Sequence, residues 1–174
     1  MLFEQLYHSY KNLVFNLALQ YVQNVSDAEE ITQDVFLTVY KKLNTFKQEA
    51  SFSTWIYRIT INKSLDFLKA KKRQKRFAFF TTLFFENGEE KKYTNQSFNH
   101  PGIELENKEA IKKIFSCINQ LPDNQKTALI LSKIEQKSQI EIAEIMSLSP
   151  KAVESLVQRA KVNLSKMLNE NEGK

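Results

Sequence analysis

The stretch SQIEIAEIMSLSPKAVESLVQRAKVNL, residues 138–164, predicts two helices joined by a short turn. Ser138 and Glu141 have the spacing of a capping box at the start of the first helix, before an apolar run. Ser149 followed by Pro150 is typical of the start of the second helix, because proline fits its first position. Two short helices in this order have the anatomy of a helix-turn-helix motif.

The turn between these helices carries one unusual residue. Ser147 stands where helices usually end on glycine, because the left-handed conformation penalises a Cβ by about 1 kcal/mol. Small Ala143 allows the two helices to cross closely. We expect Ser147 to weaken the stability of the motif and not to abolish it.

The second helix presents polar side chains on the face opposite its apolar stripe. That stripe is Val153, Leu156, Val157, Ala160, Leu164 and Met167. The residues left outside or at its margin are Lys151, Glu154, Ser155, Gln158, Arg159 and Lys161. Lysine, serine, glutamine and arginine are residue types that hydrogen-bond to base edges, so this face indicates contact with DNA. Glu154 is the exception, because a carboxylate repels phosphates.

Composition favours a helical protein with one or two small cores. The 174 residues include 42% apolar residues, 3 Gly and 3 Pro, and the net charge is +5. A charge this small means that any nucleic-acid surface is local. Cys117, the one cysteine, excludes an internal disulfide and fits an apolar helical pattern, as expected in a reducing cytoplasm. We find no basic leader and no apolar run of about 18 residues, and expect a cytoplasmic protein without membrane insertion.

The N-terminal part predicts three further helices. Residues 2–22 carry an amphipathic stripe, and Ser26 with Glu29 predicts a capping box that opens a second helix with acidic residues in its N-terminal half. A third helix is expected from about Ser53 and ends in KAKKRQKR, residues 69–76, where six of eight residues are basic.

The third helix combines aromatic rings, hydrogen-bonding side chains and cations, which a single-stranded nucleic-acid site needs. Its candidate residues are Phe52, Trp55, Tyr57, Arg58, Asn62 and Lys63, followed by Lys69, Lys71, Lys72 and Arg73. Trp55 is better explained as a core residue, and Tyr57 and Asn62 are better candidates for exposed contact. The basic run is equally consistent with a solvated helix end.

The fold expected is all-α, with two small helical domains joined by a flexible linker, the C-terminal one a helix-turn-helix. The domains are residues 1–76 and 108–170, and the linker is 77–107, where an apolar burst, FAFFTTLFF, precedes a segment without periodicity. The phenylalanines of residues 77–85 either pack on the first domain or bind a partner.

The sequence offers no constellation for catalysis. His8 and His100 lack cysteine or carboxylate partners at ligand spacing, and there is no glycine-rich phosphate loop or nucleophilic triad. We therefore expect no enzyme activity, no bound metal and no cofactor.

Two stretches resemble a known family. DAEEITQDVFLTVYKKLNTF with SFSTWIYRITINKSLDFLKAKKR resembles the second conserved region of bacterial sigma factors, and LPDNQKTALIL with SQIEIAEIMSLSPKAVESLVQRAK resembles the fourth. Without a recognisable domain between them, the chain is similar to the extracytoplasmic-function (ECF) type.

The resemblance implies a subunit that binds core RNA polymerase, directs it to promoter DNA and helps to open the duplex. It implies that Glu30, Gln33, Asp34 and Tyr40 contact the polymerase clamp. Residues 47–52 and Asn62 would capture a base flipped from the minus-ten element, and the last helix would read the minus-thirty-five element. The linker would thread toward the active-site and RNA-exit channel, and an anti-sigma factor stays open as a further partner.

The chain departs from the commoner family pattern at Glu154 and Leu156, where basic residues are frequent, so its promoter sequence stays open. The alternative from another class is a stand-alone helix-turn-helix regulator that never contacts polymerase. Such a regulator would normally dimerise to read a two-fold operator.

Overall fold

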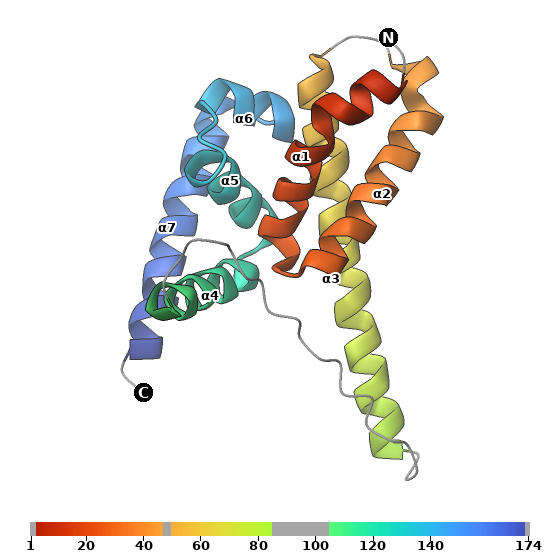
Figure 1. Ribbon diagram of the computed structural model, residues 1–174. Coiled ribbons are helices and arrows are strands. Elements are labelled where there is room, and N and C mark those ends of the chain that lie inside the picture. The colour runs from red at the N-terminus through yellow and green to blue at the C-terminus, as the bar shows by residue number, and fades with distance from the viewer. Residues whose placement is uncertain (1–2, 47–49, 85–104, 173–174) are drawn as a thin grey trace. The chain divides into compact units, whose positions relative to one another are not determined.

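The computed structural model describes residues 3–46, 50–84 and 105–172, and the side chains of 3–46, 50–76 and 109–170. In this part of the chain every regular element is a helix, which confirms the all-α prediction. The elements are α1 (Phe3–Val22), α2 (Val25–Lys42), the short 3₁₀ helix η1 (Leu43–Thr45), α3 (Phe52–Phe84), α4 (Leu105–Gln120), α5 (Asp123–Lys133), α6 (Gln139–Met146) and α7 (Pro150–Glu172) (Figure 1).

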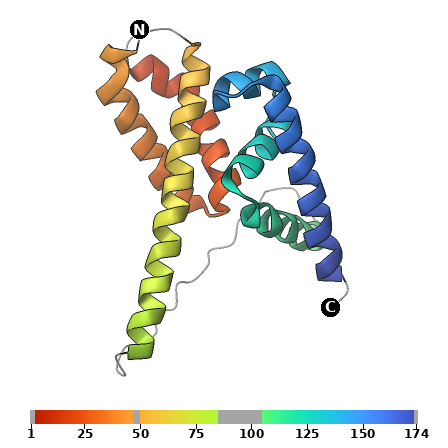
Figure 2. The same cartoon turned by 180° about the vertical axis from the view of Figure 1, so that it is seen from behind.

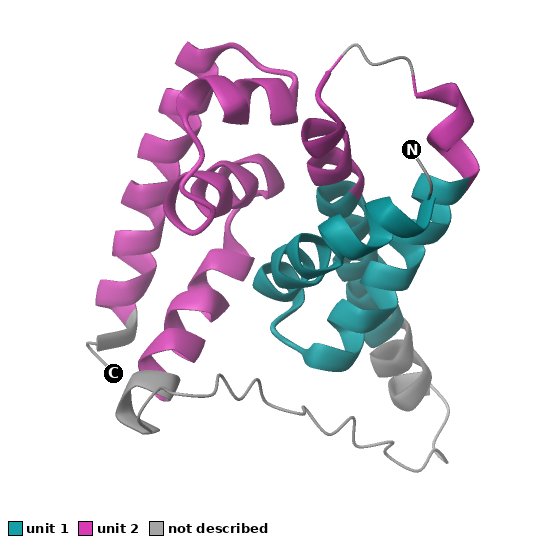
Figure 3. Cartoon of the chain, turned by 45° about the horizontal axis from the view of Figure 1, so that its top comes forward, with its two compact units in different colours: residues 1–40, 60–98 teal, residues 41–59, 99–174 magenta. Residues whose placement is uncertain are grey.

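The chain forms two compact units, coloured separately in Figure 3. Unit 1 comprises residues 1–40 and 60–98, and unit 2 comprises residues 41–59 and 99–174. The helices α2 and α3 therefore each contribute residues to both units.

Unit 1 is built on the apolar stripes of α1 and α2. Its core consists of side chains that are less than a tenth exposed: Leu6, Val14, Leu17, Ala18 and Tyr21 from α1, and Ala28, Ile31, Val35, Phe36 and Val39 from α2. Within each helix these positions are related by spacings of three, four or eight residues, which place them on one face, as the amphipathic pattern predicts. Burial of each large side chain contributes about 1.5 to 3 kcal/mol, so these stripes hold the helices together.

The start of α2 differs from the prediction. The helix begins at Val25, and Asn24 caps it: the Asn24 side-chain oxygen accepts from the backbone N–H of Asp27 at 2.9 Å. The capping box expected at Ser26 and Glu29 is therefore wrong. An asparagine cap is as favourable as a serine cap, so the chain can use the earlier site and gain two more residues of helix.

The helix α3 is longer than expected. It continues past residue 76 to Phe84, and Figure 2 shows it as one uninterrupted helix. Residues 77–84, the first part of the predicted linker, are therefore helical, and α4 begins at Leu105, three residues before 108. The rest of the predicted linker, residues 85–104, lies outside the described residues.

Within unit 2, α7 packs against α4, α5 and α6. The core here includes Cys117, Ile118, Leu121, Leu129, Ile130, Leu131, Ile142, Ala143, Ile145, Val153 and Ala160, all less than a tenth exposed. Cys117 is thus a buried core residue, as predicted. A hydrogen bond of 2.9 Å from Asn163 to the Gln125 side chain also joins α7 to α5.

The turn between α6 and α7 has the predicted chemistry. Ser138 and Glu141 form the capping box of α6, and the Ser149 hydroxyl accepts from the N–H of Ala152 at 3.2 Å. Ser147 ends α6 in the left-handed conformation, at φ 55° and ψ 45°. The N–H of Leu148 then donates to the carbonyl of Ala143 at 2.9 Å, which satisfies one of the last carbonyls of α6. The predicted helix-turn-helix is confirmed.

Candidate nucleic-acid interface

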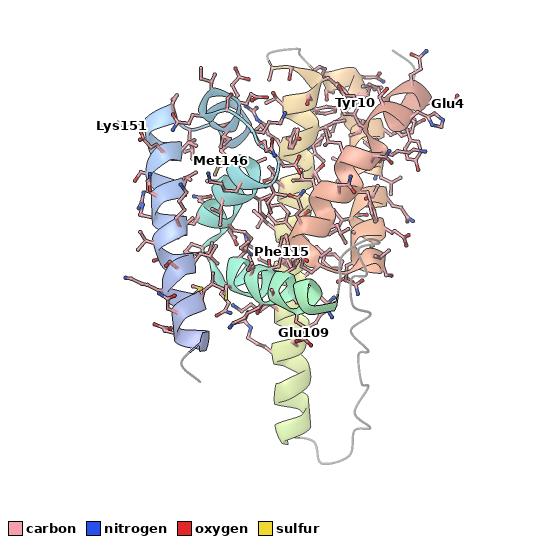
Figure 4. All side chains as sticks on the ribbon, turned by 60° about the vertical axis from the view of Figure 1, so that its left-hand side comes forward. Glu4, Tyr10, Glu109, Phe115, Met146 and Lys151 are labelled. Carbon is pink, nitrogen blue, oxygen red and sulfur yellow. The ribbon has the colours of Figure 1, made fainter. Side chains whose placement is uncertain are left out.

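The helix α7 exposes the complete set of polar residues predicted to read DNA. Lys151, Glu154, Ser155, Gln158, Arg159 and Lys161 are all exposed, whereas Val153 and Ala160 are fully buried on the opposite face. Figure 4 shows Lys151 at the N-terminal end of α7. The capped start of the helix fixes these side chains on one rigid element, which suits a site that must match base edges.

Two of the α7 residues interact with each other. The Nε of Arg159 donates to the backbone carbonyl of Ser155 at 3.3 Å, and its Nη2 donates to the Ser155 hydroxyl at 3.0 Å. These bonds hold the guanidinium along the exposed face of α7. Ser155 therefore orients Arg159.

Glu154 is exposed and forms no ion pair with Lys151 among the side chains that the structure describes. The two residues are three apart on α7, a spacing that allows a pair worth only about 0.2 to 0.5 kcal/mol. The carboxylate of Glu154 is thus available to a partner outside the chain.

The start of α6 is fixed by the Glu141 carboxylate. The carboxylate accepts from the N–H of Ser138 at 2.8 Å and lies 3.2 Å from the Lys137 ammonium. The hydrogen bonds from Ser138, followed by that from Lys137, lower the pKa of Glu141 to about 2. The carboxylate is therefore ionised at neutral pH and keeps the capping box formed.

The helix α2 exposes all four residues that the family resemblance assigns to polymerase. Glu30, Gln33 and Asp34 are exposed, and Tyr40 is 66% exposed. We did not predict Leu37, which is 57% exposed and lies on the same face, three residues after Asp34. An exposed leucine within a polar face was the signal that could have identified it.

An aromatic network supports this face of α2 from α1. The Phe3 ring meets the Tyr40 ring edge-on at a centroid distance of 5.3 Å and the Phe36 ring at 6.4 Å. Tyr7 meets Phe36 in the same way at 4.8 Å. Although Tyr40 is exposed, its ring therefore packs against Phe3 of α1.

Three rings cluster at the start of α3. Phe46 lies 4.9 Å from Trp55 and 5.4 Å from Phe52, and Phe52 lies 5.3 Å from Trp55, measured between ring centroids. All three side chains are partly exposed. Trp55 is therefore neither fully buried nor isolated. We missed Phe46, whose position beside the aromatic start of α3 was the available signal. Residues 47–49 lie outside the described residues.

The expectation for Tyr57 is wrong, whereas Asn62 is exposed as predicted. Tyr57 is 3% exposed, and its hydroxyl donates to the Glu135 carboxylate at 2.7 Å. Burial and this hydrogen bond raise the pKa of Tyr57, so it stays protonated. The neighbouring Arg58 donates to the backbone carbonyls of Glu144 at 2.5 Å and Ile145 at 3.2 Å. Helical periodicity did not predict these contacts because they are made within unit 2 by residues distant in sequence.

The cations of α3 include exposed side chains and side chains that pair with α2. Lys69, Lys72 and Arg73 are exposed. Lys63 lies 3.9 Å from the Asp34 carboxylate, and Lys71 forms a direct ion pair with Asp27. Sequence reasoning grouped these residues together because the pairing partners stand on another helix.

Within the described residues, no three histidine, cysteine, aspartate or glutamate side chains gather as a metal site would need. The same residues contain no helix whose length and apolarity would suffice to cross a membrane.

An exposed basic and aromatic helix together with a helix-turn-helix is typical of DNA-binding transcription proteins. Two family descriptions match the chain: Sigma-70 region 2 over residues 6–74 and Sigma-70 region 4 over residues 111–164. The ECF RNA polymerase sigma-E factor of Haemophilus influenzae is 30% identical over 159 residues, with 91% of this chain and 83% of that protein covered. SigW of Bacillus subtilis, also an ECF sigma factor, is 28% identical, with 92% and 86% covered.

Solved structures share the fold. The sigma factor RpoE of Bartonella quintana, solved with the anti-sigma factor NepR, has a TM-score of 0.65 and 19% identity, covering 96% of each chain. CnrH, solved with the cytosolic domain of CnrY, has a TM-score of 0.65 and 22% identity, covering 97% of this chain and 88% of that chain.

The chain belongs to the ECF family of RNA polymerase sigma factors. Members of this family are transcription initiation factors that act with core RNA polymerase at promoter DNA. The match over residues 6–74 disfavours the stand-alone regulator, which would need only the helix-turn-helix.

Proposed function

We propose that this sigma factor uses three helices for three tasks: binding polymerase, binding the opened promoter strand and reading the promoter duplex. The outer face of α2 binds core RNA polymerase, α3 with the aromatic cluster at its start binds the opened minus-ten element, and α7 reads the minus-thirty-five element. The proposed modules are residues 1–76 and 108–170, joined by residues 77–107. The observation that carries the proposal is that each helix exposes a different chemistry: carboxylates on α2, rings and cations on α3, and amides and cations on α7.

The α2 face presents two apolar side chains next to two carboxylates, and we expect polymerase to contact both kinds. Leu37 and Tyr40 are more than half exposed, and Asp34 and Glu30 stand about one and two turns before Leu37. Exposed carboxylates steer a basic partner, and exposed apolar side chains supply area to bury on contact. A polymerase surface with cations around an apolar patch would match this face.

The start of α3 supports the binding of unstacked bases. Phe46, Phe52 and Trp55 form a partly exposed aromatic cluster, and stacking on aromatic rings contributes about 1 to 3 kcal/mol per base. Asn62 is exposed on the same helix and can bond to a base edge. Lys69, Lys72 and Arg73 follow, and we assign them to phosphates.

The exposed face of α7 supports readout in the major groove. Gln158 and Arg159 carry donors for adenine and guanine edges, and Ser155 orients Arg159. Lys151 and Lys161, at either end of this set, are suited to phosphate contacts.

The test is transcription reconstituted from core RNA polymerase and the full chain on a library of promoter fragments, with the transcripts sequenced. We expect start sites that share a minus-ten and a minus-thirty-five sequence and that are absent with core enzyme alone. Gel filtration of the mixture should show one complex. A chain that binds DNA as a dimer and yields no transcripts above core alone would contradict the proposal.

A further inference from the structure

Two ion pairs join α2 to α3 within unit 1, where these helices lie side by side in both Figure 1 and Figure 2. Asp27 pairs directly with Lys71, and Asp34 lies 3.9 Å from Lys63. Two residues seven apart on α2 thus face two residues eight apart on α3, each spacing close to two helical turns. The order is reversed along the two helices, so the two ion pairs lie one after the other along the contact between α2 and α3.

The ion pair between Asp27 and Lys71 is the stronger of the two. The Asp27 side chain is 18% exposed and that of Lys71 41%, whereas Asp34 and Lys63 are 58% and 37% exposed. The Lys71 ammonium also lies 5.7 Å from the centre of the Phe67 ring, which attracts a cation. The contact at Asp34 is long, and an exposed pair of that kind contributes little.

Asp27 is itself held in place. Its backbone N–H donates to the side chain of Asn24 at 2.9 Å, so Asp27 belongs to the capped first turn of α2. A carboxylate in the first turn is also favoured by the helix dipole. Lys71 is therefore tied to a fixed point on α2, and its charge is already balanced by a largely buried partner.

This pairing separates Lys71 from its neighbours. Lys72 and Arg73 are exposed, so each can approach a phosphate at no internal loss. If Lys71 did the same, it would have to leave Asp27 and strand a carboxylate that is only 18% exposed. Burial of an unpaired charge is unfavourable, so Lys71 gains less from a phosphate than Lys72 does.

We propose that Asp27 and Lys71 are a positioning pair, which fixes the basic half of α3 against α2, and that Lys71 does not bind phosphate. This inference rests on the proposed function, in which polymerase holds α2 and the minus-ten DNA contacts α3. The pair then transmits the position of the polymerase-bound helix to the DNA-binding one. Loss of the pair loosens this alignment while all phosphate contacts remain.

The first experiment measures the salt dependence of promoter binding by holoenzyme that contains the full chain. Lys72→Gln and Lys71→Gln remove the same charge one residue apart, so each is the matched control of the other. Each lost phosphate contact lowers the log-log slope by about 0.9. We expect this change for Lys72→Gln and none for Lys71→Gln. An equal decrease in both variants would overturn the proposal.

The second experiment is a double-mutant cycle on the rate of promoter opening, followed by permanganate reactivity. Asp27→Asn and Lys71→Gln should each slow opening about twofold to fivefold, the range expected for one partly exposed ion pair. The double variant should be no slower than either single variant, because both remove the same interaction. Defects that multiply would show that the two residues act separately.

Failure of the proposed function gives a different result. If Lys72→Gln and Arg73→Gln also leave the salt slope unchanged, the basic half of α3 does not bind phosphates. In that case the double-mutant cycle still tests whether Asp27 and Lys71 act as a positioning pair. If Asp27→Asn raises DNA affinity and steepens the slope, Lys71 binds phosphate once freed, and its neutralisation by Asp27 would be inhibitory, contrary to the proposal.

Discussion

At the scale of single residues, Glu154 poses the sharpest chemical question. A carboxylate that faces DNA repels phosphates, and it is tolerated where it accepts a hydrogen bond from a base. The donors in the major groove are the amino groups of cytosine and adenine. Glu154 is exposed and Lys151 does not pair with it in the described part of the chain, so its carboxylate is open to such a donor.

We predict that Glu154 accepts a hydrogen bond from a cytosine in the minus-thirty-five element. Glu154→Ala should then relax preference at one base pair and cost about 1 to 3 kcal/mol on the preferred site. Affinity for random DNA should rise slightly, because a repulsion is removed. Binding selection with wild-type and variant holoenzyme measures both effects, and unchanged preferences at every base would show that Glu154 reads nothing.

Ser147 is a point of backbone strain in the helix-turn-helix. Its φ of 55° places a Cβ in the left-handed region, which costs about 1 to 2 kcal/mol. Ser147→Gly should remove this cost, but the glycine also gains conformational freedom in the unfolded chain. The free energy of unfolding should therefore rise by only about 0.5 to 1 kcal/mol. Urea unfolding measures this change.

The matched control for Ser147 is Ser149→Ala, two residues further along. Its hydroxyl caps α7, so its loss should lower the free energy of unfolding by about 1 kcal/mol. If Ser147→Gly lowers the free energy of unfolding as Ser149→Ala does, the strain assigned to Ser147 is not present in solution.

At the scale of helices, α2 carries charge that its own packing does not need. Glu30 is exposed, and Asp34 makes only a long contact with Lys63. We predict that Glu30→Lys with Asp34→Lys weakens binding to core RNA polymerase at least about tenfold while the helical content is unchanged. Competition with a second sigma factor for core enzyme measures the affinity.

The matched control for this double reversal is Glu109→Lys with Glu170→Lys. Both residues are exposed on helices outside the proposed docking face, and the change in net charge is the same. The control should bind core enzyme like the wild type. An equal loss in both variants would mean that overall charge, and not the face of α2, governs the association.

Sequence patterns located these helices well and their ends poorly. Periodicity predicted the buried stripes of α1, α2 and α7, because each stripe depends on one helix alone. The end of α3 was missed because its last residues are aromatic and β-branched, which have low helix propensity. No glycine or proline occurs between residue 52 and Gly88, however, so nothing in the chain itself stops the helix before Phe84.

At the scale of the whole molecule, the contacts that the sequence did not predict are those between residues far apart along the chain. Lys71 and Asp27 are 44 residues apart, and Tyr57 and Glu135 are 78 apart. The local sequence pattern assigned both Lys71 and Tyr57 to the DNA surface, because it does not identify a partner that is distant along the chain. The residues of α2 and α7 were placed correctly on exposed faces because exposure follows from the stripe opposite.

The proposed division between base-binding and phosphate-binding residues predicts at which step of initiation each residue acts. A residue that contacts the duplex contributes to the first, closed complex, whereas a site for an extruded base acts only after that base leaves the stack. Asn62 is exposed on α3, the helix at whose start the aromatic cluster lies. Lys72 is exposed further along the same helix, where we assign it to a phosphate.

We predict that Asn62→Ala slows promoter opening more than it weakens closed-complex binding. Extrusion of a base costs a few kcal/mol, and loss of one contact to that base removes part of the compensation. Permanganate reactivity follows opening, and filter binding on ice follows the closed complex. A template with the minus-ten region already unpaired should restore the Asn62→Ala variant, because the extrusion step has been made beforehand. Lys72→Ala should gain nothing from that template, since its phosphate is present in both forms. If the unpaired template rescues neither variant, or both equally, Asn62 is not part of a pocket for an extruded base.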